Sequence, residues 1–245
     1  RTDRVNLNLD KRNGRITMSD KDGKVLLQND QSPRSAYETG FEISFRLVED
    51  EKLYGTGDVS RSEIQKRGHK YQMFIKNVES YIPIPFMMSD RNWGLFMNTT
   101  MIHSFDAGAT ASDRLSVSGN KGILDFFLME GESLPDVLEK YTEITGKPHL
   151  LPKWGYGLIW VSLTADTRSR DILYEAEEFR SRGIPCDVFG LEPGWMEKYY
   201  DYSTTKDWSK ERFPMITSKP WLRKNRKLGT FVGALENMGF KLSLW

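Results

Sequence analysis

Residues 184–214 read IPCDVFGLEPGWMEKYYDYSTTKDWSKERFP, and this stretch decides how the second half of the chain is interpreted. Cys186 to Leu191 is a short apolar run that follows a helix pattern ending at Gly183, as expected of a buried parallel strand. Glu192 comes directly after it, at the end of the strand where parallel barrels deliver functional side chains. A carboxylate there costs free energy unless it is paired, and sugar hydroxyls are suitable partners because each can donate to a carboxylate oxygen. The stretch therefore predicts a sugar-binding floor, with an ordinary loop glutamate as the alternative.

The residues around this stretch alternate between strand and helix patterns. Residues 154–161 (WGYGLIWV) fit a first strand, and Asp166 or Thr167 then caps a helix with one apolar face. A second helix pattern precedes residues 240–245 (FKLSLW), which open a third strand. Such alternation predicts a parallel sheet, and a parallel strand without a neighbour would expose an apolar edge. We therefore expect residues 153–245 to be the truncated start of a (β/α)8 TIM barrel, with about three of its eight strands.

The first half of the chain has a different sequence pattern, in which short runs of alternating apolar and polar residues are separated by turn sequences. The segments with the length and composition of strands are 14–19, 41–48, 71–76, 94–98 and 122–128. No helical period competes with them, so we predict an antiparallel β-sandwich over residues 1–131. Ser133 then caps a helix, which we place in a linker of residues 132–152.

The charge balance and the cysteine count limit the classes of partner. The 35 basic and 34 acidic residues give a net charge of +1, which argues against a nucleic-acid partner. The most basic run, residues 219–227 (KPWLRKNRK), is interpreted as a solvated helix entry. The single cysteine, Cys186, cannot form an intramolecular disulfide and leaves the compartment open between cytoplasm, periplasm and secretion.

We expect a soluble protein with no membrane partner, because no apolar run approaches the roughly 20 residues that span a bilayer. No signal-like segment opens the chain at Arg1. The oligomeric state is left open. We expect no cofactor and no metal, because residues 55–57 (GTG) lack a third glycine and His69, His103 and His149 are far apart.

Short motifs in a shared order carry a resemblance to glycoside hydrolase family 31, which contains α-glucosidases and α-xylosidases. In the first half they are LYGTGD at 53–58, YIPIPF at 81–86 and WGLFMN at 93–98. In the second half they are YTEITGKP at 141–148, RGIPCDVF at 182–189 and ERFP at 211–214. Each motif alone is weak, but together they follow the order found in the family. The resemblance implies a galactose-mutarotase-like sandwich followed by a catalytic barrel.

The resemblance also implies an activity: an exo-acting, retaining hydrolase that releases a terminal α-linked sugar from an oligosaccharide or glycoconjugate. That chemistry needs two carboxylates about 5 to 5.5 Å apart, one as nucleophile and one as acid/base. In the family, these aspartates follow barrel strand four and a later strand, and no position here matches either. We therefore expect both to lie beyond Trp245 and the chain alone to be inactive. A non-catalytic carbohydrate-binding fragment is the alternative from another class.

The end of the second barrel strand departs from the family pattern, which reads N-D-I-D-Y-M or F-D-x-F-W-M. Anchoring on Trp195 and Met196 places Glu192 on an aspartate that binds hydroxyls of the terminal sugar in the family. Gly194 stands where the family has Asp or Phe. The longer acidic side chain and the missing side chain lead us to expect a sugar altered around O4 or C2, as in an α-galactoside or an α-N-acetylgalactosaminide. An α-glucosidase or α-xylosidase is the alternative.

Other aromatic residues complete the predicted site. The predicted substrate-binding residues are Glu192, Trp160, Gly194 and Trp195. Trp160, at the end of the first barrel strand, would form an apolar wall for a sugar face, with core packing as its alternative. Tyr199, Tyr200 and Trp208 would flank the entrance or simply pack the loop.

Overall fold

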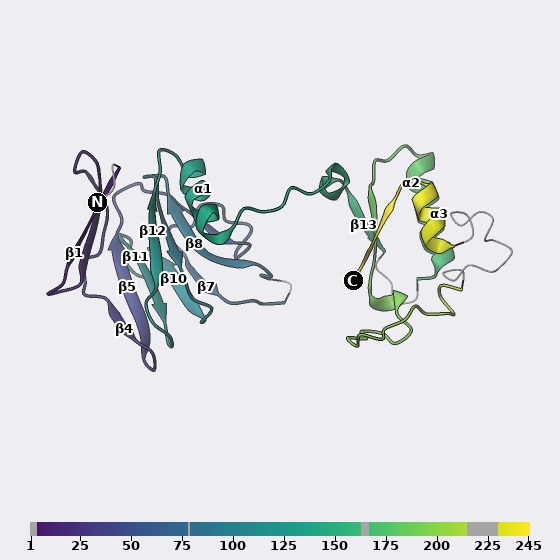
Figure 1. The fold of residues 1–245 in the computed structure, drawn as a ribbon, viewed down its shortest axis with the longest axis horizontal. Helices are drawn as coiled ribbons and strands as arrows, with labels where there is room; N and C mark the ends of the chain where they lie inside the picture. The colour runs from purple at the N-terminus through teal and green to yellow at the C-terminus, as the bar shows by residue number, and fades with distance from the viewer. Residues whose placement is uncertain (1–3, 78, 163–166, 215–229) are drawn as a thin grey trace. The chain divides into compact units, whose positions relative to one another are not determined.

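The structure is a computed structural model that describes residues 4–77, 79–162, 167–214 and 230–245. The chain divides into two compact units, Arg1–Lys147 and Pro148–Trp245, and Figure 1 shows the elements of each. Asp166 and the basic run 219–227 lie outside the described residues, so the structure does not address the predicted role of that run. No helix in the described ranges is both long enough and apolar enough to cross a bilayer.

The described strands of the first unit are antiparallel and form three sheets (Figure 1). One sheet contains β1 (Val5–Asp10), β2 (Arg15–Asp20) and β3 (Val25–Gln28). The second has the order β4 (Arg34–Ala36), β5 (Gly40–Arg46), β11 (Arg114–Gly119), β10 (His103–Ala107), β7 (Lys70–Met73). The third has the order β12 (Phe126–Glu130), β9 (Trp93–Met97), β8 (Pro83–Ser89), β6 (Leu53–Gly57). The predicted β-sandwich is confirmed.

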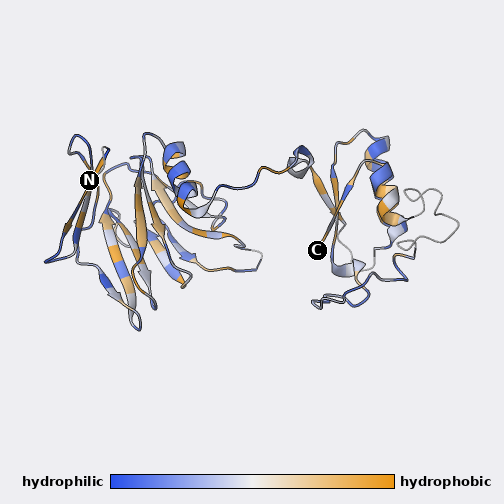
Figure 2. Ribbon diagram, viewed as in Figure 1, coloured by the Kyte–Doolittle hydropathy of each residue, from blue (hydrophilic) through white to orange (hydrophobic). Residues whose placement is uncertain are grey.

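Alternation of apolar and polar residues gives these sheets one shared core, and Figure 2 shows the apolar residues following the strands. The core also holds a buried acid, Glu51, which is 3% exposed. Its carboxylate accepts hydrogen bonds from the Trp93 indole N–H at 2.7 Å, from the Val48 backbone N–H at 2.9 Å and from the Ser89 hydroxyl. A buried carboxylate is tolerated here because several donors replace its water.

The helix α1 (Leu134–Thr145) begins at the predicted cap: the Ser133 hydroxyl accepts a hydrogen bond from the Asp136 N–H. Val137 is buried, and the Tyr141 ring stacks on Phe86 with centroids 4.3 Å apart. The helix that we placed in a linker therefore packs on the sheet that contains β8, β9 and β12 (Figure 1).

The second unit contains three parallel strands in the order β13 (Ile159–Ser162), β14 (Val188–Leu191), β15 (Lys241–Leu244). The connections carry α2 (Ser169–Ser181) and α3 (Phe231–Asn237), as in the start of a barrel. The first strand begins at Ile159 instead of residue 154, because Lys153–Tyr156 forms a 3₁₀ turn. The second begins at Val188 instead of Cys186. The N-cap of α2 is Arg168, so the cap that we predicted at Asp166 or Thr167 is wrong. The predicted barrel start is otherwise confirmed.

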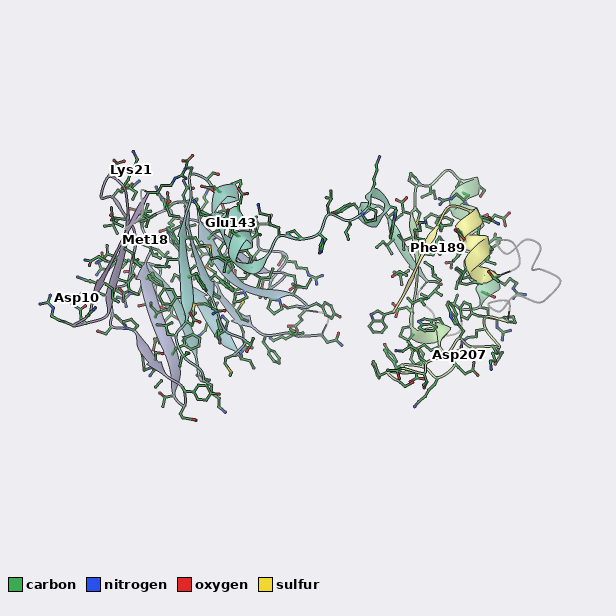
Figure 3. All side chains as sticks on the ribbon, in the orientation of Figure 1. Asp10, Met18, Lys21, Glu143, Phe189 and Asp207 are labelled. Carbon is green, nitrogen blue, oxygen red and sulfur yellow. The ribbon has the colours of Figure 1, made fainter. Side chains whose placement is uncertain are left out.

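The helices bury one face of this sheet. Phe189, on the middle strand and labelled in Figure 3, is fully buried and meets the rings of Phe179 and Phe240 edge-on. Arg180, near the end of α2, places its guanidinium 3.5 Å from the centre of the Phe240 ring. The same group donates hydrogen bonds to the carbonyls of Met238 and Cys186, at 2.6 and 3.0 Å. Arg180 thus joins the end of α2 to the segments that enter β14 and β15.

Candidate functional site

Glu192 directly follows β14, at the carboxyl edge of the parallel sheet. The chain then makes one 3₁₀ turn, Pro193–Trp195, whose Trp195 N–H donates to the Glu192 carbonyl at 3.2 Å. The Glu192 side chain is partly buried, and within the described residues it has no ion pair and no side-chain hydrogen bond.

A small hollow opens beside Glu192. It is lined by Ser162, Thr167, Ile172, Leu191, Glu192, Gly194, Trp195 and Phe213. Its free volume is about 10 Å³, which is about the room that one water molecule needs. The hollow therefore admits a water molecule but not a sugar ring.

Arg212 holds the turn that presents Glu192. Its Nε–H donates to the Gly194 carbonyl at 2.8 Å, and its Nη2–H donates to the Met196 carbonyl at 2.7 Å. The Arg212 carbonyl in turn accepts from the Ser169 N–H at 3.0 Å, at the start of α2. The next residue, Phe213, is 1% exposed in the core. The ERFP motif is therefore a clamp on the turn, a role that we did not predict although we identified the motif.

Trp195 belongs to the hydrophobic core of the second unit. Its side chain is buried, its indole N–H donates to the Trp245 carbonyl at 2.9 Å, and its ring lies 4.9 Å from that of Trp208. The Trp208 ring in turn meets the Phe213 ring edge-on, with the ring centroids 5.1 Å apart. Of the two alternatives that we gave for Trp208, the structure shows packing.

The structure places Trp160 against α2. Its indole N–H donates to Glu175 at 3.0 Å, its ring lies 5.3 Å from that of Phe179, and it is 41% exposed. Of the predicted site residues, Glu192, Gly194 and Trp195 come together at the hollow, and Trp160 is not among the residues that line it. Its role as a sugar wall stays a prediction.

An aromatic loop follows the turn and carries Tyr199, Tyr200 and Tyr202. Tyr200 has a left-handed backbone with φ of 53°, which is costly for a bulky residue. Its ring is 4.6 Å from that of Tyr199, 6.1 Å from that of Tyr202 and 5.4 Å from that of Trp245. We predicted Tyr199 and Tyr200 but not Tyr202, because ring contacts depend on how the loop folds.

The negative charge of Glu192 acts on the hydroxyl of Tyr200 in this loop. The pKa of Tyr200 is raised, first by desolvation, then by Tyr199, and further by the negative charge of Glu192. The Asp201 carboxylate accepts from the Ser203 N–H at 2.9 Å, which lowers the pKa of Asp201. Asp207, labelled in Figure 3, ends the loop, where its carbonyl accepts from the Glu197 N–H. No group of acidic, histidine and cysteine residues in the described ranges is arranged to hold a metal ion.

Two family models match the chain. Residues 1–106 match the glycosyl hydrolase 31 N-terminal galactose mutarotase-like domain, and residues 148–242 match the TIM-barrel domain of glycosyl hydrolases family 31. An α-xylosidase of Emericella nidulans is 28% identical over 80% of this chain and 24% of its own length. Alpha-glucosidase 2 of Bacillus thermoamyloliquefaciens is 29% identical over 85% of this chain and 27% of its own length.

A solved structure also resembles this chain along nearly its whole length. A Flavobacterium johnsoniae GH31 dextranase, in a mutant complexed with isomaltotriose, has a TM-score of 0.81 and is 26% identical. The match covers 99% of this chain and 29% of the dextranase. The chain thus spans about a quarter of the length of the proteins that it matches.

Proposed function

The chain belongs to glycoside hydrolase family 31, and we propose that it binds the terminal α-linked sugar of an oligosaccharide or glycoconjugate for hydrolysis. The observation that carries the proposal is the position of Glu192. This carboxylate follows the middle parallel strand, is partly buried, and lacks a partner among the described side chains.

Each residue of the site has a distinct role in this proposal. The two Glu192 oxygens accept hydrogen bonds from hydroxyls of the terminal sugar, which donate readily to a carboxylate. Gly194, which has no side chain, lines the hollow next to Glu192. Trp195 supports the turn from below, and Arg212 fixes it through the carbonyls of Gly194 and Met196.

The bond cleavage itself is assigned to other carboxylates. Retaining hydrolysis needs a pair of them about 5 to 5.5 Å apart, and we assign neither member to a described residue. In this proposal Glu192 recognises the sugar and does not attack it. We expect the 245-residue chain alone to bind sugar without cleaving it.

Two substrate classes compete. The names of the relatives, α-xylosidase and α-glucosidase, favour an α-glucoside or α-xyloside. The residues Glu192 and Gly194 favour a sugar altered at O4 or C2, as in an α-galactoside or an α-N-acetylgalactosaminide, because an epimeric hydroxyl needs a different arrangement of acceptors. We keep the second class as the proposal that the site residues support.

Binding measurements test the role of Glu192 directly. The probes are methyl α-glycosides of glucose, xylose, galactose and N-acetylgalactosamine, titrated into the chain by calorimetry. Glu192→Gln keeps the shape and removes the charge, so we expect affinity for the preferred glycoside to fall about 10- to 100-fold. The control is Glu177→Gln, an exposed acid on α2, which should bind as the unchanged chain does.

Two results would contradict the proposal. Unchanged affinity in Glu192→Gln would remove Glu192 from the site. A clear preference for the glucoside over the galactoside, in binding and in kinetics of a longer protein that contains this chain, would end the proposal about O4 and C2.

A further inference from the structure

The loop that follows the Glu192 turn exposes a large area of aromatic ring. Tyr202 is 86% exposed and Tyr199 is 50% exposed, while Tyr200 lies between them and is less exposed. The rings of Tyr200 and Tyr202 are nearly parallel, with 30° between their planes. Exposed neighbouring aromatic residues are unusual on a loop without a ligand or partner, since their burial is strongly favourable.

The backbone conformation of Tyr200 also indicates a ligand site in this loop. Tyr200 is held at a φ of 53°, in the left-handed region that a bulky side chain rarely adopts. Its ring contacts those of Tyr199 and Tyr202 on either side. Strain of this kind persists when the surrounding structure maintains it, and it is concentrated at ligand sites.

The charges of the loop indicate the chemistry of the ligand. Residues 197–208 carry Glu197, Asp201 and Asp207 against Lys198 and Lys206, so basic groups are not in excess. A phosphorylated or otherwise anionic ligand would require such an excess. Tyrosine rings combine an apolar face with a hydroxyl that donates and accepts, which suits a neutral polyhydroxylated ring.

From these observations we propose that Tyr199, Tyr200 and Tyr202 form a stacking surface for the second and third sugar units of the substrate, beside the terminal-sugar site at Glu192. This inference rests on the proposed function, because it takes Glu192 as the site of the terminal sugar. The surface makes the protein favour oligosaccharides over single glycosides. Trp245 joins the two parts of the site: its ring lies 5.4 Å from that of Tyr200, and its carbonyl accepts from Trp195, which lines the hollow beside Glu192.

The experiment compares sugars of different length on the same variants. The probes are an α-linked glucose trisaccharide and an α-linked galactose trisaccharide, each paired with its methyl glycoside. Dissociation constants are measured by calorimetry, and saturation-transfer NMR reports which sugar protons lie near aromatic rings. Tyr199→Ala and Tyr202→Ala are the test variants, and Tyr174→Ala is the matched control, a tyrosine on α2 that is 65% exposed.

We expect the unchanged chain to bind one trisaccharide about 3- to 10-fold more tightly than the methyl glycoside, a gain typical of one or two ring contacts. Tyr199→Ala and Tyr202→Ala should remove this gain and leave the methyl glycoside within twofold. Tyr174→Ala should keep the gain. Since Tyr202 is mostly exposed, its replacement should not unfold the protein.

Several results would overturn the stacking surface: no gain with sugar length, no binding of either sugar, or an equal loss for both sugars in the tyrosine variants. A dimer that Tyr202→Ala dissociates would show that a second copy covers the loop. Glu192→Gln separates this inference from the proposed function. If Glu192→Gln changes nothing while the tyrosine variants remove the length gain, the terminal-sugar site fails and the stacking surface stands.

Discussion

Replacing Arg212 should loosen both the second unit and the site. Arg212→Ala removes two charge-assisted hydrogen bonds, 2.8 Å to the Gly194 carbonyl and 2.7 Å to the Met196 carbonyl. Gly194 and Met196 are buried, so water cannot fully replace the lost donor. A hydrogen bond to a charged group is worth about 1.5 to 3 kcal/mol. Because Arg212 is partly exposed, we expect a combined loss of about 2 to 4 kcal/mol in the free energy of unfolding.

Urea unfolding of the whole chain, followed by tryptophan fluorescence, measures this loss. The described tryptophans are Trp154, Trp160, Trp195, Trp208 and Trp245 in the second unit and Trp93 in the first, so the signal mainly follows the second unit. With a urea dependence of about 1 to 1.5 kcal/mol/M for a unit of this size, the midpoint should fall by about 2 M. Affinity for the preferred glycoside should fall with it, because the turn before Met196 loses its clamp.

Two other variants make the result specific. Arg212→Lys keeps the charge but cannot donate to both carbonyls in a fixed fork, so its effect should be intermediate. Arg182→Ala removes an exposed ion pair with Glu178 in α2, which is worth about 0.3 to 0.5 kcal/mol. If Arg212→Ala is no less stable than Arg182→Ala, the clamp does not hold the turn and the reasoning is wrong.

Substitutions of Trp93, Asp58 and Trp160 test three other contacts. Trp93→Phe leaves the buried Glu51 without its indole donor and should cost about 3 kcal/mol, measured by circular dichroism in urea; an unchanged midpoint would contradict it. The second prediction concerns Asp58. Desolvation raises the pKa of this carboxyl, but hydrogen bonds from two backbone N–H groups, Arg61 and Ser80 outweigh it and lower the pKa from 3.8 to about 2. Its stabilising contribution is therefore full above pH 4 and is lost as pH falls from about 4 to 2, so Asp58→Asn should reduce the acid sensitivity of the thermal midpoint in that window. Trp160→Phe removes the hydrogen bond to Glu175 and makes the ring beside Phe179 smaller, so it should lower the free energy of unfolding by about 1 kcal/mol; a fall in sugar affinity with an unchanged urea midpoint would support Trp160 as a sugar wall.

The sequence predicted the architecture because its periodicities are local. The apolar run before Glu192 and the turn residues of the first half each report on a few neighbouring positions, and both units follow those patterns. The start of the first parallel strand was placed too early. Residues 154–158 are as apolar as a strand, but the backbone turns at residues 153–156 before the ladder begins. Composition alone does not separate the two.

The site was less predictable, because it depends on contacts between distant residues. A strand of a parallel sheet can be apolar on both faces, so the side to which Trp160 points is not encoded in its neighbours. The clamp joins Arg212 to carbonyls 16 and 18 residues earlier, and no sequence period reports such a pair. The exposed Tyr202 could have been included, since it lies in the same loop as the two tyrosines that we named.

The position of Arg180 has a consequence for how this barrel segment can diverge. Its guanidinium joins the end of α2 to the segments that lead into β14 and β15, at the edge of the sheet opposite Glu192. In the proposed function, the Arg180 contacts and the sugar site therefore lie at opposite rims of the same sheet. If the proposed function holds, we expect an exchange of residues 197–208 between relatives to change sugar preference while the contacts of Arg180 keep the scaffold assembled.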